Sequence, residues 1–313
     1  MEEQDIQWNG LRAVRLTGGG YEAVIAPDFG ANCISLRRSD QAFECLRTPP
    51  SLQALAQAPN VYGLPLLFPP NRIHGGTYVF EGRAYSFPIN EPARSSHLHG
   101  VLSATPFARA GEGAFVYHAT REAPYLSFPH AFTLERRYAL DERGLTHQIV
   151  VTNHSEHNMP LGLGVHAAWR VFSPEARLQI PVLRQWAVDA HTIVPTGEKI
   201  SDGPLLDTLR EGRLLPEEQA LSCLLECAPG PVRLSDGKVS FCCQADANTR
   251  FLMLWNGGGH AGFVCPEPQT WLVDAPNLPW SPAETGMSWL RPGETRCYEL
   301  RYYVERRQGG SQP

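Results

Sequence analysis

Features that direct a chain to membranes or nucleic acids are missing from these 313 residues. No apolar run is long enough to span a bilayer, and the first ten residues, MEEQDIQWNG, are too acidic and polar for a signal peptide. Lys and Arg total 27 against 32 Asp and Glu, a net charge of −5, and no basic stretch stands out. We therefore expect a cytoplasmic protein with no nucleic-acid or membrane partner.

Cysteine spacing also excludes a paired zinc motif. In a reducing compartment we expect free thiols that pack as small buried apolar side chains. The eight cysteines are Cys33, Cys45, Cys223, Cys227, Cys242, Cys243, Cys265 and Cys297.

Helical periodicity is scarce. Short helices are predicted at 51–57, capped by Ser51, and at 220–225, after Pro216-Glu217-Glu218. Residues 132–140, 145–151 and 298–304 instead alternate with period 2, and 28 Gly and 27 Pro supply turns. With no linker or repeat, we predict one all-β domain over residues 1–313, a large antiparallel β-sandwich. One face of the first alternating segment is Phe132, Leu134, Arg136, Tyr138 and Leu140.

One stretch, residues 64–100, gathers polar residues around turns. It reads LPLLFPPNRIHGGTYVFEGRAYSFPINEPARSSHLHG. Pro69-Pro70 stops the apolar run, a hairpin turns at Glu81-Gly82, and the stretch closes on His97-Leu-His99-Gly100. An arginine at one loop and histidines at another are typical of a polar site built on a β scaffold.

Two later residues also have settings that favour chemistry. His166 ends a run, LGLGV, in which apolar residues alternate with glycine, and a His there can be fixed in one tautomer. Glu267 lies between Pro266 and Pro268, which hold an extended backbone and present the carboxylate stiffly. Without further evidence, His166 could equally be a buried structural histidine, and Glu267 could be an exposed glutamate in a loop.

Three motifs in order resemble the aldose 1-epimerase (galactose mutarotase) family: PLLFPPNRIHGG, HLHG, and the segment FVCPEPQTWLVDAPN around Glu267. The resemblance implies the family's β-supersandwich fold and the interconversion of the α and β anomers of a free aldose. It implies a small-molecule sugar as partner, no cofactor and no metal. We expect a monomer or a homodimer.

The resemblance also implies roles for single residues. Glu267 would be the general base and His166 the general acid, while Arg72 and His99 would bind the sugar, with Asn71 and His97 as further substrate-binding candidates. His97 and His99 alone are too few ligands for a metal site. Trp169, Trp255, Trp271 and Phe263 are candidates to stack on the sugar, although most aromatics in a β protein form the core.

The chain departs from the family pattern twice. Ala167-Ala168-Trp169 follows His166 where His-Pro-Tyr-Phe is common, and the family's substrate-binding Asp is missing near Ser222. The sugar preference is therefore open.

Three other functions stay open at this point. A hexose-6-phosphate mutarotase would need extra cations, for which Arg94, Arg170 and His74 are candidates. A carbohydrate-binding protein without catalysis would use the same pocket. A glycosidase would need two suitably spaced carboxylates, and only Glu267 lies in a strong motif.

Overall fold

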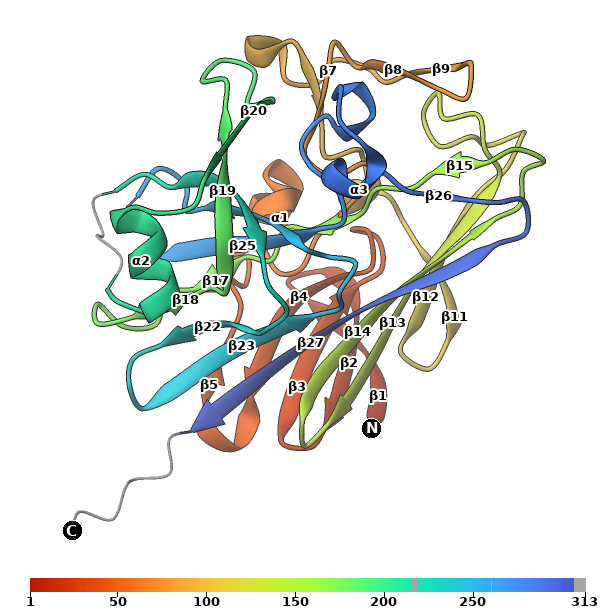
Figure 1. Ribbon diagram of the computed structural model, residues 1–313. Helices are drawn as coiled ribbons and strands as arrows, with labels where there is room; N and C mark the ends of the chain where they lie inside the picture. The colour runs from red at the N-terminus through yellow and green to blue at the C-terminus, as the bar shows by residue number, and fades with distance from the viewer. Residues whose placement is uncertain (215–218, 260, 307–313) are drawn as a thin grey trace.

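Antiparallel strands dominate the computed structural model, which describes residues 1–214, 219–259 and 261–306 (Figure 1). Two large sheets pack as a sandwich, which confirms the predicted fold class, and a five-stranded sheet lies beside them. The N-terminal sheet contains β1 (Glu2–Trp8), β2 (Leu11–Gly18), β3 (Tyr21–Ala26), β4 (Asn32–Arg38) and β5 (Phe43–Glu44).

The first large sheet contains the long strands that the alternating pattern predicted. Its order is β11 (Ala108–Gly111), β12 (Ala114–Ala119), β13 (Phe132–Asp141), β14 (Gly144–Asn153), β27 (Thr295–Arg306), β23 (Val239–Ala245), β22 (Val232–Ser235) and β18 (Arg177–Gln179). The predicted hairpin is β13–β14, and the predicted C-terminal strand is β27, which inserts between β14 and β23.

The second large sheet carries the candidate site. Its order is β20 (Pro195–Ile200), β19 (Val182–Val188), β21 (Ser222–Cys227), β24 (Phe251–Trp255), β25 (Phe263–Gln269), β16 (Gly164–Val165) and β6 (Leu66–Leu67), and β17 (Trp169–Arg170) also pairs with β25. Three two-stranded pairs complete the sheets: β7 (Arg72–His74) with β10 (Ser96–Leu98), β8 (Thr77–Phe80) with β9 (Arg83–Ser86), and β15 (Met159–Pro160) with β26 (Trp289–Leu290).

Helices are short in the described part of the chain: α1 (Leu52–Gln57), α2 (Pro204–Glu211) and α3 (Pro282–Thr285). Ser51 caps α1 as predicted, because its side chain accepts a hydrogen bond from the Ala54 N–H. The helix predicted at 220–225 is wrong: residues 222–227 form β21, and Pro216–Glu218 lie outside the described residues. Among the described residues, no helix has the length and apolar character to cross a bilayer.

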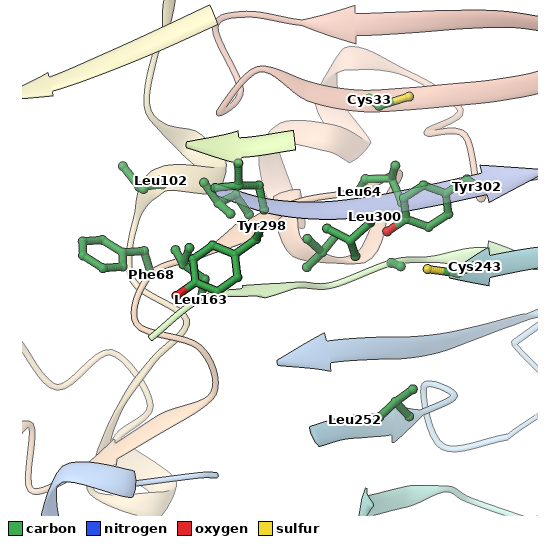
Figure 2. Packing of buried hydrophobic residues seen from close by; sticks show 14 of the residues in the cluster. Cys33, Leu64, Phe68, Leu102, Leu163, Cys243, Leu252, Tyr298, Leu300 and Tyr302 are labelled. Atoms are coloured by element: carbon green, nitrogen blue, oxygen red, sulfur yellow. The ribbon is translucent and has the colours of Figure 1, made fainter. Parts of the chain in front are cut away.

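Apolar side chains from both large sheets and from the N-terminal sheet meet in one core. Figure 2 shows Cys33, Leu64, Leu252 and Tyr302 among them, from parts of the chain far apart in sequence. All eight cysteines are free, and six are buried as expected. Cys297 is exposed instead, because it lies on the outward face of β27, next to the buried Tyr298.

One charged side chain lies inside this core. Arg136, on the inward face of β13, is fully buried. Its guanidinium donates to the carbonyl oxygens of Gly30 (2.8 Å) and Leu64 (2.7 Å) and to the ring of His147 (3.1 Å). Arg136 therefore ties the N-terminal sheet to the start of the polar stretch 64–100.

Candidate active site

His166 and Glu267 meet on neighbouring strands of the second large sheet. His166 directly follows β16, where its backbone N–H donates to the Pro65 carbonyl (2.9 Å), and Glu267 lies in the middle of β25. The two side chains are almost fully buried, and His166 Nε2 lies 3.1 Å from Glu267 Oε1. Although 101 residues separate them in sequence, the fold brings the two side chains into close contact, and we call this pair the dyad.

The prolines beside Glu267 fit one edge of β25. Pro266 and Pro268 have no N–H to donate, and they pair in register with Leu254 and Leu252 of β24. On the opposite edge, β17 pairs at residues 263–264 and β16 pairs only at Gln269. Residues 265–268 thus have no partner on that edge among the described strands, which is the kind of position where a strand tolerates proline.

His99 reaches the same place from a different sheet. β10 ends at Leu98, and His99 takes a left-handed backbone conformation (φ 64°), so the alternation of side chains along the strand stops before His99. Gly100 follows with φ 67°, and a Cβ there would lie 1.9 Å from the Phe68 carbonyl oxygen, so only glycine fits. The ring of His99 packs edge-on against that of His166, with centroids 5.3 Å apart.

Arg72 is held by two neighbours. Its Nε and Nη2 donate to the Glu91 carboxylate at 2.6 and 2.8 Å, and Nη1 donates to Asn71 Oδ1 at 3.1 Å. Asn71 also accepts the His99 N–H on its carbonyl (2.9 Å). The arrangement fixes the cation near the dyad, and Asn71 contacts both Arg72 and His99.

His97 lies outside this cluster. Its ring is fully buried, packs at a tilt against that of Phe87, and forms a hydrogen bond with the Pro88 carbonyl oxygen through Nδ1 (2.7 Å). Of the six site residues proposed from sequence, the structure brings His99, His166 and Glu267 together. Arg72 and Asn71 lie beside this cluster, and His97 lies outside it. The sequence analysis did not identify two neighbours of these residues. Glu91 pairs with Arg72, and no sequence pattern predicts that pair. Gln269 follows Glu267 by two residues, a spacing that places both side chains on the same face of a strand and could have identified it.

Among the four aromatic candidates, Trp255 is the one that lies against His166. It is partly exposed, and its ring meets that of His166 edge-on at 5.7 Å. Trp169 and Trp271 are fully buried core residues, and Phe263 packs behind Trp255. Ser222, where the family's Asp was expected nearby, is exposed and pairs across the sheet with Trp255.

The cations considered for a phosphate group lie elsewhere or are engaged. The Arg94 guanidinium donates to the carbonyls of Ala190 (3.1 Å) and His191 (2.5 Å) and lies 3.6 Å from Glu91. Arg170 is exposed on β17, and His74 is exposed at the end of β7, where its backbone N–H donates to Asp274.

Burial controls the protonation of the dyad. It raises the pKa of Glu267 well above its usual value, against the opposing effects of the Arg72 charge and the Gln269 hydrogen bond. It also lowers the pKa of His166 to about 4 and that of His99 well below 6.5. Burial therefore disfavours charge on both side chains and favours a neutral pair that shares one proton.

His99, His166 and Glu267 are residue types that bind transition metals in proteins. Their ligand atoms lie within 4.8 Å of one another. Metal-binding histidines almost always pair their second ring nitrogen with another group, yet Nδ1 of His99 and of His166 has no hydrogen-bond partner among the described residues. We therefore keep the prediction that the chemistry needs no metal.

Treatment with a chelator is expected to leave anomer exchange unchanged, because an acid and a base suffice for the reaction. The rate at which the sugar anomers interconvert would be measured by proton NMR before and after dialysis against EDTA. Complete loss that a single metal ion restores would contradict this prediction.

Comparison with known proteins places this geometry in a family. A family model described as aldose 1-epimerase matches residues 12–303. A galactose mutarotase-like protein from Clostridium acetobutylicum is 28% identical, with a TM-score of 0.89 over 97% of this chain and 98% of that one. The galactose 1-epimerase of Lactobacillus acidophilus NCFM shares the fold at 13% identity, with a TM-score of 0.75 over 97% and 99% of the two chains.

A curated relative matches only in part. YihR, an uncharacterized protein of Escherichia coli K12, is 29% identical over 127 residues, which are 39% of this chain and 41% of YihR. The match thus spans less than half of that relative's length. The family model, by contrast, covers nearly the whole chain, and the structural neighbours are galactose mutarotase-like. These matches support a general mutarotase-like function, and the chain belongs to the aldose 1-epimerase family.

Proposed function

We propose that this protein is an aldose 1-epimerase that interconverts the α and β anomers of a free aldose. The observation that carries the proposal is the buried 3.1 Å contact between His166 Nε2 and Glu267 Oε1, with the His99 ring against that of His166. Ring opening of a sugar needs one group that takes the C1-hydroxyl proton and one that gives a proton to the ring oxygen. A dyad that holds a single proton supplies both.

In the proposed mechanism, Glu267 accepts the proton of the C1 hydroxyl while His166 donates one to the ring oxygen. The ring opens, the C1–C2 bond rotates, and closure from the other face gives the other anomer. The dyad then has the opposite protonation, and the closing step restores it. The chemistry balances without a cofactor, because each proton taken is returned.

The assigned roles require the tautomer with an ionised Glu267 and a protonated His166. The neutral pair reaches it when one proton moves from Glu267 Oε1 to His166 Nε2, across the 3.1 Å that separate these two atoms. The Arg72 charge and the Gln269 N–H both favour the carboxylate. A sugar that hydrogen-bonds to both members would replace the contact between them and keep the proton within the site.

The surroundings of the dyad fit a sugar. Arg72 is held rigidly by Glu91, and its remaining N–H groups can donate to hydroxyls, while His99 borders the dyad. The partly exposed face of Trp255 can stack on the apolar face of a pyranose.

We also propose that the chain is a single domain that acts in the cytoplasm as a monomer or homodimer.

The test is proton NMR or polarimetry of freshly dissolved sugars, with spontaneous mutarotation subtracted. Glucose, galactose, other aldoses and their 6-phosphates would be compared. Faster anomer exchange on at least one free aldose supports the proposal. Saturable binding without faster exchange on any sugar would favour a carbohydrate-binding protein, and cleavage of glycosides would favour a glycosidase.

The pH profile of kcat/KM should have a broad plateau through neutral pH. Burial disfavours both the doubly protonated dyad, which is positively charged, and the fully deprotonated dyad, which is negatively charged. The acid limb therefore moves below the ordinary His value of 6.5, and the alkaline limb moves well above the ordinary Glu value of 4.5. Half of the activity lost already at pH 6.5 would contradict the described burial.

A further inference from the structure

Gln269 lies directly beside the proposed base. It is fully buried at the end of β25, two residues after Glu267, so both side chains project from the same face of the strand. Its Nε2 donates to Glu267 Oε2 at 3.3 Å, while Oε1 of the same carboxylate faces His166 at 3.1 Å. The two carboxylate oxygens are therefore held separately, one by an amide and the other by an imidazole.

The fold fixes Gln269 tightly in this position. Its backbone pairs with Phe251 of β24 on one side and with Gly164 of β16 on the other. A Cβ on Gly164 would lie 3.0 Å from both the Gln269 Cγ and the Pro70 Cβ, so this glycine leaves room for the Gln269 side chain. The requirement for glycine at 164 is thus one of space and not of backbone conformation.

We propose that Gln269 is a positioning residue for Glu267, which holds Oε2 so that Oε1 meets His166 and the sugar, and which stabilises the carboxylate form. This inference rests on the proposed function. A neutral amide suits the task because it donates a hydrogen bond without adding a charge to the buried dyad. The charge of Arg72 also favours the Glu267 carboxylate, but the Nε and Nη2 groups of Arg72 donate to Glu91.

The first experiment replaces Gln269 by Met, which has a similar length but no N–H. Loss of a hydrogen bond to a charged group should lower kcat by about 10- to 100-fold, with KM changed less than about threefold. Gln244→Met is the matched control: Gln244 lies on β23 in the other large sheet, where its amide donates to the Ala245 carbonyl, and we expect wild-type rates.

The second experiment replaces Gln269 by Glu, which has nearly the same shape but donates only when protonated. If Gln269 acts as a donor, the rate deficit of this variant should grow as pH rises. If Gln269 only fills space, Gln269→Met, which adds no charge beside Glu267, should keep the wild-type pH profile, and that result would overturn the proposal.

A readout without catalysis separates this inference from the proposed function. Carbon-13 NMR of labelled glutamate carboxyl groups, with the Glu267 signal assigned by its absence in Glu267→Gln, follows the titration directly. Gln269→Met should raise the pKa of Glu267 by about one to two units. An unchanged titration overturns the role of Gln269 even in an active enzyme. A shifted titration in a protein that exchanges no sugar anomers would instead reject the epimerase proposal alone.

Discussion

Glu267→Gln and His166→Asn are each expected to lower kcat by about two to four orders of magnitude, the usual range for a positioned acid or base. Gln keeps the shape of Glu267 but cannot accept the C1 proton as a carboxylate does. Asn removes the group that gives a proton to the ring oxygen. Sugar affinity should fall much less, because Arg72 and His99 remain. The assay is anomer exchange by NMR, with the spontaneous rate subtracted.

Because the two residues serve one proton-transfer event, the double variant should lose less than the product of the two single losses. Glu284→Gln and His118→Asn serve as controls, since both side chains are exposed and outside the cluster. Near wild-type exchange by Glu267→Gln on the best sugar would mean that another group is the base.

Arg136→Met should reduce the free energy of unfolding by about 2–5 kcal/mol. The substitution leaves the buried carbonyls of Gly30 and Leu64 without their donor, and each unsatisfied group costs about 1–3 kcal/mol, partly offset because a charge is no longer buried. Denaturant unfolding, followed by tryptophan fluorescence, measures the change.

The adjacent residue provides a control of the same type. The Arg137 side chain is 51% exposed and pairs only with Glu135 among the described residues, at 2.7 Å. Arg137→Met should therefore change the unfolding free energy by less than about 0.5 kcal/mol. Equal effects of the two substitutions would show that the buried hydrogen bonds of Arg136 contribute little.

Strands with one buried face and one solvent-exposed face were predicted correctly from the alternation of apolar and polar residues. The alternation at 132–151 predicted β13 and β14, and it even placed Arg136 on the inward face. It misjudged β21 because Cys223, Leu224 and Leu225 are all buried, and a continuous apolar run has no period that separates a strand from a helix. It also missed α2, although Pro204 at its first position and Gly212 after its end are ordinary helix boundary signals.

For the candidate site, motif resemblance selected the residues but not their environment. Nothing in the sequence around Glu267 or His166 states that both are buried, and burial is what shifts their pKa values. The Arg72–Glu91 pair likewise depends on how the loop that contains Glu91 folds back toward β7. Such properties arise from packing between distant segments, which a local pattern does not encode.

The wide spacing of the site along the chain has a consequence for protein synthesis. Arg72 and His99 leave the ribosome early, His166 follows near the middle, and Glu267 emerges late, only a short distance before β27. A nascent chain can thus form the N-terminal sheet and the β13–β14 hairpin while it still lacks its base. Under the proposed function, activity can begin only after β25 has joined β24.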